Sequence, residues 1–293
     1  MRSKKKNDGD KMIFDKVYFI GTGRVGSDCL KVIVDACGPE KVECLAVEQE
    51  TVPIMYQQSK RLGVSYKAFD SKSLRKYLLS FERNNLLISA HNQYIFTEDV
   101  VTKENLKIIN FHNAYLPEYR GRNAPTWEIF NGESYGGATW HLVAAGVDTG
   151  NIIVQEKVAI EQSDTALSLL MKCARVGVRL LRENIGAFLN DSYETILPQK
   201  IGRLYYSKEL PNGGWLPVNS SFKEIKRFLL AMDYHGMPIV PLPRVKINDV
   251  TYIVDSYEFC KKPCMVCNTA LFISDNGGKE YINCSLQKEC LLL

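Results

Sequence analysis

Residues 16–38 read "KVYFIGTGRVGSDCLKVIVDACG", an apolar run of strand length followed by three glycines and a helix-like pattern. Gly21, Gly23 and Gly26 have the G-x-G-x-x-G spacing of a dinucleotide-binding turn. Glu48 ends the next apolar run, at the position where such a site would hold a ribose hydroxyl. The glycine spacing is a weak signal alone, so this stretch predicts an α/β fold and leaves dinucleotide binding as one hypothesis.

Strand-length apolar runs alternate with helix-like stretches along the first part of the chain. Strands are predicted at 17–20, 43–47, 86–90 and 107–111, and helices at 25–36, 53–62 and 71–82. This alternation favours a Rossmann-like, mostly parallel sheet with helices on both faces. A further pair of strands is predicted at 139–144 and 151–160, joined by a loop that contains glycine. A long helix should follow over 164–189, with Asp164 placed to cap its start.

The composition changes after about position 203, where short mixed runs alternate with Pro and Gly around a short helix predicted at 221–232. We therefore predict a basic tail over 1–11, an α/β domain over 12–203 and a smaller β-rich C-terminal domain over 204–293. No apolar signal region follows the basic tail, and no apolar run reaches the roughly 18 residues of a membrane span. A formal net charge of +4 is mild. These features predict a cytoplasmic protein with neither a membrane nor a nucleic-acid partner.

Five of the nine cysteines lie between 260 and 290. Cys264, Cys267, Cys284 and Cys290 could supply four zinc ligands, but the second pair is spaced more widely than is usual in a zinc ribbon. We therefore expect free thiols and no metal. The last four residues, Cys290-Leu-Leu-Leu, also fit a prenylation box, without a dense basic run upstream.

The most informative stretch for chemistry runs from 108 to 156. Asn110 and His112 lie two residues apart at the carboxyl end of an apolar strand, so both face the edge where open α/β sheets bind ligands. Asp148 lies in a loop that can return to the same edge. His141 shares a strand face with Thr139 and either lines the pocket or has a structural role.

An amide, an imidazole and a carboxylate at one edge suit acyl transfer to a substrate that brings its own nucleophile. The amide donates to an oxyanion, and the imidazole, oriented by the carboxylate, relays a proton. The alternative for each residue alone is a structural histidine or a turn.

The segments "NFHNAYLPEYRG", "GATWHLVAAGVDTG" and "NIIVQE" resemble the folate-dependent formyltransferases, over roughly 12–200. This family includes glycinamide ribonucleotide, methionyl-tRNA and sugar-nucleotide N-formyltransferases. The resemblance implies that Asn110, His112 and Asp148 are catalytic and that 10-formyltetrahydrofolate is the formyl donor. It also implies that the glycine turn serves close packing rather than dinucleotide binding.

The resemblance further implies a folate-binding region, where backbone groups hold most of the donor, and side-chain chemistry suggests a second region for the acceptor. The folate should rest against Ser89, Ala90, His91, Asn92, Gln93, Tyr94, Ile95, Val143, Ala144 and Gly146. The acceptor should meet Tyr119, Arg120, Gly121, Arg122 and His141, where an arginine fork suits a diphosphate unless the loop simply faces solvent.

The resemblance favours a dTDP- or UDP-linked amino sugar as the acceptor, as in O-antigen or lipopolysaccharide biosynthesis. The basic, Gly-rich insertion of methionyl-tRNA enzymes is replaced here by "EQETVPIMYQQSKRLG" at 48–63, and glycinamide ribonucleotide enzymes usually end near position 200. Methionyl-tRNA, a peptide or another small amine, and a non-catalytic folate- or NAD-binding module, remain alternatives. Sugar formyltransferases are often dimers, so a homodimer is possible.

Overall fold

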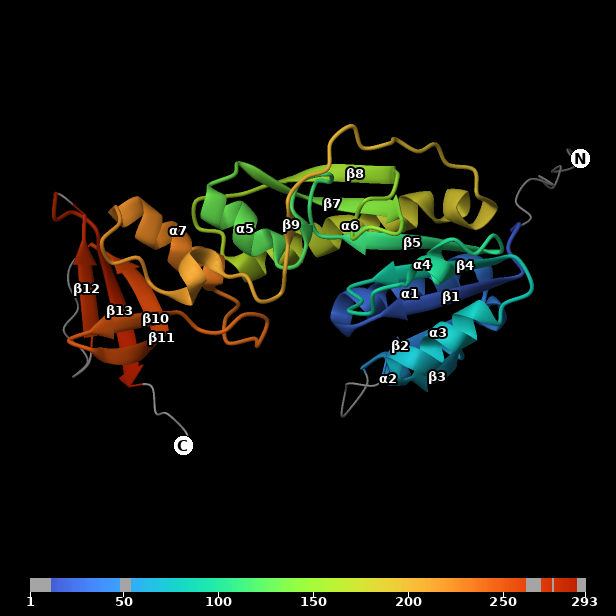
Figure 1. Cartoon of the computed structure of the whole chain (residues 1–293), viewed down its shortest axis with the longest axis horizontal. Helices are drawn as coiled ribbons and strands as arrows, with labels where there is room; N and C mark the ends of the chain where they lie inside the picture. The colour runs from blue at the N-terminus through green and yellow to red at the C-terminus, as the bar shows by residue number, and fades with distance from the viewer. Residues whose placement is uncertain (1–11, 48–53, 262–269, 276, 289–293) are drawn as a thin grey trace, which may run out of the picture. The chain divides into compact units, whose positions relative to one another are not determined.

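The computed structural model describes residues 12–47, 54–261, 270–275 and 277–288. The chain forms two compact units, each built from several segments. The first unit contains 1–120, 137–157 and 172–204, and the second contains 121–136, 158–171 and 205–293. Helices and strands carry the labels of Figure 1.

A seven-stranded sheet with the order β3-β2-β1-β4-β5-β7-β8 organises the first unit (Figure 1). Its strands are β1 (Lys16–Gly21), β2 (Val42–Val47), β3 (Ser65–Phe69), β4 (Asn85–Ala90), β5 (Leu106–His112), β7 (Tyr135–Leu142) and β8 (Ile152–Ala159). The first five strands pair in parallel, and β7 pairs antiparallel with β5. The predicted mostly parallel α/β sheet is therefore confirmed.

Helices cover both faces of this sheet, because successive residues of each strand point to opposite sides. The helices are α1 (Gly23–Cys37), α2 (Ile54–Leu62), α3 (Ser71–Leu79), α4 (Glu98–Val101) and α6 (Ala166–Asn190), with a short 3-10 turn η1 (Pro39–Lys41). Phe19 of β1 packs in one core with residues of α1, α2 and α6. Its neighbours Tyr18 and Ile20 pack in a second core with α3 and α4.

The glycine-rich turn between β1 and α1 is a packing device. A Cβ at Gly21 would lie 2.6 Å from the carbonyl oxygen of Ala90, and one at Gly26 would lie 3.0 Å from the backbone carbon of Gly21. Glycine is therefore needed for α1 to approach the strands this closely. Thr22 Oγ1 donates to the carbonyl oxygen of His91 at 2.7 Å, which ties the turn to the loop after β4.

Two local features differ from the sequence expectations. The sequence does not predict strand β3, because it is an edge strand whose residues are exposed or half-buried and carry no buried apolar alternation. The cap of α6 is Thr165 rather than Asp164: Thr165 Oγ1 accepts from the backbone N–H of Ser168 at 3.1 Å. Asp164 instead accepts from the backbone N–H of Glu161 at 2.7 Å. Glu48, Pro53 and the predicted basic tail lie outside the described residues.

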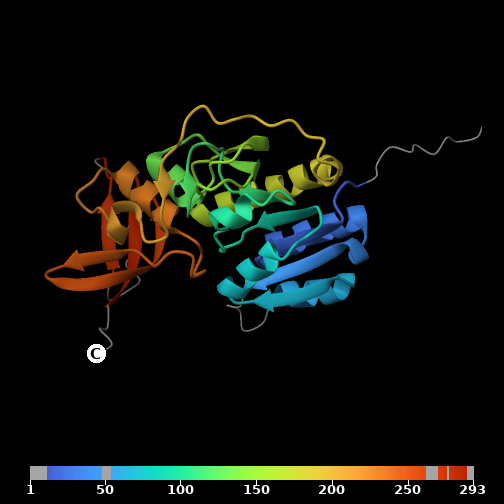
Figure 2. The same cartoon turned by 45° about the vertical axis from the view of Figure 1, so that its right-hand side comes forward.

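The second unit contains a four-stranded antiparallel sheet, drawn in orange and red in Figure 2. Its strand order is β10-β11-β13-β12. Its elements are α5 (Ala124–Asn131), η2 (Pro211–Gly214), α7 (Phe222–Met232), β10 (Arg244–Ile247), β11 (Val250–Cys260), β12 (Ala270–Ser274) and β13 (Tyr281–Lys288). The two-residue strands β6 (Arg120–Gly121) and β9 (Leu204–Tyr205) pair with each other. Helix α7 begins with a capping box between Ser221 and Glu224 and buries Phe228 in the core. The smaller β-rich C-terminal region is thereby confirmed.

The predicted domain boundaries remain a prediction. The compact units share the predicted break near 204, but the second unit also takes in 121–136 and 158–171. These segments belong there because Phe130 of α5 and Ala166, in the first turn of α6, pack in the same core as α7.

The described residues test the cysteine and membrane hypotheses only in part. Cys284 is a buried thiol of β13, whereas Cys264, Cys267 and Cys290 lie outside the described residues, so the zinc and prenylation hypotheses stay untested. Within 12–47, 54–261, 270–275 and 277–288, no three His, Cys, Asp or Glu side chains gather as a metal site would require. A helix with the length and apolarity of a membrane span is likewise absent from these ranges.

Candidate active site

The register of three neighbouring strands places the candidate residues in rows. Ser89 of β4 pairs with Asn110 of β5, which pairs in turn with His141 of β7. His112 pairs with Thr139 in the next row. Because paired residues of adjacent strands project to the same face, these five side chains share one face at the carboxyl end of β5. The prediction that His141 shares a face with Thr139 is confirmed.

Asp148 reaches this face from the loop between β7 and β8. The loop turns sharply: Asp148 has φ 50°, in the left-handed region. A Cβ at Gly150 would lie 1.7 Å from the carbonyl oxygen of Leu142, so only glycine fits there. The Asp148 carboxylate lies 3.5 Å from His112, measured from Oδ2 to Nδ1, and 3.5 Å from His141, measured from Oδ1 to Nε2. The structure thus brings Asn110, His112 and Asp148 together.

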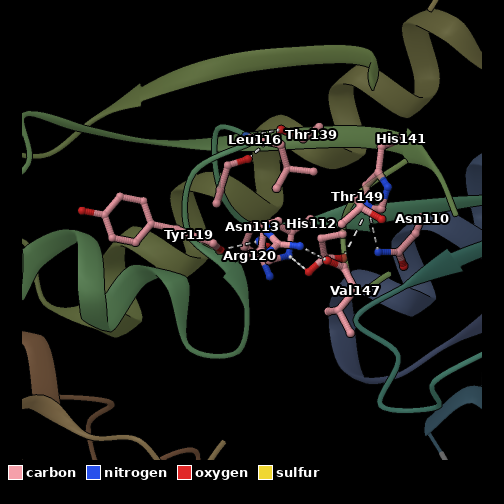
Figure 3. A network of polar contacts seen from close by, with 12 residues as sticks. Asn110, His112, Asn113, Leu116, Tyr119, Arg120, Thr139, His141, Val147 and Thr149 are labelled. Carbon is pink, nitrogen blue, oxygen red and sulfur yellow. Dashed lines mark hydrogen bonds and ion pairs between the residues drawn. The ribbon is translucent and has the colours of Figure 1, made fainter. Parts of the chain in front are cut away.

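The imidazole of His112 lies between two oxygen atoms. Its Nε2 lies 2.8 Å from the carbonyl oxygen of Tyr119, which can only accept, so this nitrogen carries a proton (Figure 3). Its Nδ1 faces the Asp148 carboxylate. The Asp148 carboxylate is therefore placed to stabilise positive charge on the ring when the reaction protonates it.

His141 of β7 contacts the side chain of Asn110 on the neighbouring strand β5. Its Nδ1 lies 2.8 Å from the carbonyl oxygen of Leu142, which can only accept, so Nδ1 is the donor. Its Nε2 then accepts from the Asn110 amide at 3.2 Å, which leaves the second N–H of that amide for a ligand (Figure 3). His141 is only 1% exposed. So buried a ring favours a role in orienting Asn110, and its predicted contact with the acceptor stays a prediction.

The predicted folate region divides into a buried and an open part. Ser89 and Ala90 are both 0% exposed in the middle of the sheet, so only their backbone groups could contact a folate, and their binding role stays a prediction. His91 stacks on Phe111, and its Nε2 lies 3.0 Å from Asn113 Oδ1. Burial lowers the pKa of His91 and outweighs the hydrogen bond with Asn113, which alone would raise that pKa. The ring is therefore neutral at physiological pH.

The remaining predicted folate contacts lie in two loops. Asn92 Oδ1 accepts from the backbone N–H of Tyr94 at 3.0 Å, and the loop exposes Gln93 and, at 70%, Ile95. In the other loop, Val143 donates its backbone N–H to Ile108 at 2.9 Å, Ala144 is half-buried and Gly146 is exposed. The folate contacts of these loops stay a prediction.

Arg120 is engaged with the backbone of its own unit. Its Nη1 donates to the carbonyl oxygen of Val147 at 3.0 Å, and its Nε donates to that of Gly202 at 2.9 Å. Two of its nitrogens are thus engaged by backbone oxygens, and its predicted contact with a diphosphate stays a prediction. Gly121 and Arg122 belong to the second unit, and their predicted acceptor contacts remain predictions, as do those of the Tyr119 side chain.

Residues 24–185 match the family model described as formyl transferase, which is more than half of the chain. The chain belongs to this family.

Relatives in the formyl transferase family share most of this chain. It is 30% identical over 191 residues to GDP-perosamine N-formyltransferase of Brucella melitensis, covering 65% of this chain and 71% of the relative. It is 27% identical over 228 residues to a methionyl-tRNA formyltransferase of Alkaliphilus oremlandii, covering 73% and 72%. WlaRD, a sugar 3N-formyl transferase solved in the presence of dTDP and 5-N-formyl-THF, has the same fold, with a TM-score of 0.73 at 18% identity. The match covers 96% of this chain and 100% of WlaRD.

Sequence reasoning missed two supporting contacts of the site. The bond between the His112 ring and the Tyr119 carbonyl oxygen carries no sequence signal, because any residue supplies that oxygen. The partner of His91, Asn113, lies just after β5, and only the parallel pairing of β4 with β5 brings the two side chains together.

Proposed function

We propose that this formyl transferase moves the formyl group of 10-formyltetrahydrofolate to the amine of a nucleotide-linked amino sugar. The observation that supports it most is the grouping of Asn110, His112 and Asp148 at the carboxyl end of β5. One amide N–H is left for a ligand, and a buried imidazole faces a carboxylate. Acyl transfer to an amine needs these groups and no nucleophile from the protein.

The reaction would proceed by attack of the unprotonated acceptor amine on the formyl carbon, which forms a new carbon–nitrogen bond. Negative charge then develops on the formyl oxygen, where the Asn110 N–H and the His112 imidazolium stabilise it. When the bond from the formyl carbon to N10 breaks, its electron pair goes to N10, which takes a proton from His112. The proton lost by the amine then restores the imidazolium. Because Nδ1 faces Asp148, the transferred proton is the one on Nε2, which must leave the carbonyl oxygen of Tyr119 to reach N10.

The acceptor is proposed from the relatives. GDP-perosamine N-formyltransferase of Brucella melitensis takes a GDP-linked amino sugar by its name, and WlaRD was solved with dTDP. WlaRD also matches the fold across both units of this chain. A methionyl-tRNA acceptor is the second candidate, because a methionyl-tRNA formyltransferase matches at a similar identity. The mild net charge of +4 argues against a dedicated tRNA surface.

The cellular setting is proposed with the same function. A nucleotide sugar and a folate are metabolites of the cytoplasm, so we place the protein there. Its product would supply surface polysaccharide, such as O-antigen. A homodimer is proposed from the sequence resemblance alone.

The test is a panel of acceptors incubated with 10-formyltetrahydrofolate, with tetrahydrofolate release as the readout. The panel contains GDP-, dTDP- and UDP-linked 3-amino and 4-amino sugars and methionyl-tRNA. We expect turnover on one nucleotide sugar, its loss in His112→Ala, and normal turnover in the surface control Lys31→Ala, which removes an exposed helix ion pair. Turnover on methionyl-tRNA alone would replace the sugar proposal, and turnover on none of the acceptors would contradict the proposed function.

A further inference from the structure

We propose that Arg120 is a positioning residue that holds the loop of Asp148 at the distance from His112 that formyl transfer needs. The proposal rests on the proposed function for its kinetic consequence, while the clamp itself is a property of the fold. It assigns to Arg120 a role in the rate of transfer, in place of the nucleotide contact expected from the sequence.

The guanidinium of Arg120 joins three segments of the first unit. Arg120 is the first residue of the short strand β6, its Nη1 donates to the carbonyl oxygen of Val147 and its Nε donates to that of Gly202. Val147 immediately precedes Asp148, so this hydrogen bond fixes the backbone one residue from the carboxylate (Figure 3). The anchor at Gly202 is close-fitting, because a Cβ there would lie 2.0 Å from the carbonyl oxygen of Pro117.

Arg120 and its neighbour Tyr119 together control both partners of the His112 ring. The Tyr119 carbonyl oxygen accepts from Nε2 at 2.8 Å. The carboxylate that faces Nδ1 belongs to the loop bound by Arg120. A displacement of this short stretch would therefore alter both sides of the imidazole at once.

The Asp148 loop needs such a support. Asp148 and Tyr119 have φ values of 50° and 55°, a left-handed conformation that costs energy for residues other than glycine. Gly146 is exposed and Val147 is 38% exposed, so packing contributes little to holding these two residues, which immediately precede Asp148. The hydroxyl of Thr149 donates to Gly146 at 3.0 Å, but that bond lies within the loop and does not attach it to β5.

An arginine is required for this geometry. Its planar guanidinium presents donors in a fixed fork, so Nε and Nη1 can reach carbonyl oxygens of two different segments. A lysine ammonium is a single point on a flexible stem and cannot reproduce both bonds in one fixed arrangement. Arg120→Lys should therefore behave like Arg120→Ala.

The experiment compares Arg120→Ala and Arg120→Lys with Arg179→Ala, which removes a surface arginine that pairs with Glu156 and Glu183. Formyl-transfer kinetics are measured on the acceptor found with the panel, with and without added guanidinium chloride at a concentration that leaves the fold intact. Amide hydrogen exchange is measured on the wild type and the three variants without substrate.

We expect kcat to fall by about 100-fold in both Arg120 variants, because small misplacements of catalytic groups cost this much. KM for the nucleotide sugar should change by less than about threefold, since no ground-state contact is lost. Guanidinium should restore part of kcat in Arg120→Ala and nothing in Arg120→Lys. In both Arg120 variants, amide hydrogen exchange should accelerate at 143–151 and stay unchanged in β1 and β4. Arg179→Ala should match the wild type in kinetics and in exchange.

A rise in KM with unchanged kcat would overturn the proposal and return Arg120 to a nucleotide contact. Unchanged exchange at 143–151 in both variants would show that no clamp exists. If the wild-type protein transfers formyl to none of the acceptors, the proposed function fails, and hydrogen exchange still decides the clamp. If Arg120→Ala does not fold, Arg120→Lys serves for both readouts.

Discussion

Replacement of Asp148 by asparagine tests how the site stabilises charge. The substitution keeps the shape of the side chain and the left-handed turn, which asparagine tolerates, and removes only the negative charge. The carboxylate Oδ2 lies 3.5 Å from His112 Nδ1. At that separation and an effective dielectric of about 20, two unit charges attract by about 5 kcal/mol.

Only the imidazolium form of His112 gains this attraction, and the neutral amide of asparagine retains part of it as a dipole. We therefore expect the transfer step to slow by about 1,000-fold, since each 1.4 kcal/mol corresponds to about tenfold. KM for the folate and the acceptor should change little, because the charge acts on the transition state.

The assay is single-turnover formyl transfer, with thermal unfolding to show that the variant is folded. Asp35→Asn is the matched control, because its carboxylate lies in an exposed ion pair with Lys31. A loss of less than about tenfold in Asp148→Asn would refute the electrostatic reasoning, because a charge 3.5 Å from the ring would then contribute almost nothing. A large loss in Asp35→Asn as well would mean that the assay reports general destabilisation.

Three further predictions concern support of the site and stability. His141→Gln should lower kcat by about tenfold with little change in KM, because the Asn110 amide loses its fixed acceptor; steady-state kinetics decide this, and unchanged kcat would contradict it. Burial raises the pKa of the Glu128 carboxyl well above 4.5, and the charge of Glu133 adds a smaller effect in the same direction. The protonated carboxyl therefore contributes its full stabilisation below pH 4.5, and this contribution is lost as pH rises through the pKa of the folded state. Thermal unfolding should show this loss in the wild type and not in Glu128→Gln, and parallel pH profiles of the two proteins would contradict it. Gly177→Ala should destabilise by about 1–3 kcal/mol in urea unfolding, because its Cβ would lie 2.2 Å from the Phe111 ring; an unchanged midpoint would show that the ring can move.

Much of the fold follows from local pattern. Buried parallel strands are continuous apolar runs, so β1, β2, β4 and β5 are predictable to within a residue or two. The two-residue period of a strand also places Asn110 and His112 on one face from their spacing alone. Edge strand β3 lacks that pattern, because solvent covers it and polar residues are tolerated there.

The remaining features of the site depend on contacts between distant segments. His141 supports Asn110 only because β5 and β7 pair in one particular register. The partners of Arg120 lie 27 and 82 residues away and are backbone oxygens, which no side-chain pattern reveals. For the same reason the sequence suggests a phosphate ligand where the structure shows two backbone hydrogen bonds.

The most direct measurement follows an isotopically labelled formyl carbon from 10-formyltetrahydrofolate into the acceptor, using wild-type protein, Asn110→Ala and His112→Ala. We predict a labelled N-formyl sugar nucleotide with the wild type and almost none with either variant. Labelled product in equal amounts from all three proteins, or from none of them with any acceptor, would contradict formyl transfer at the carboxyl end of β5.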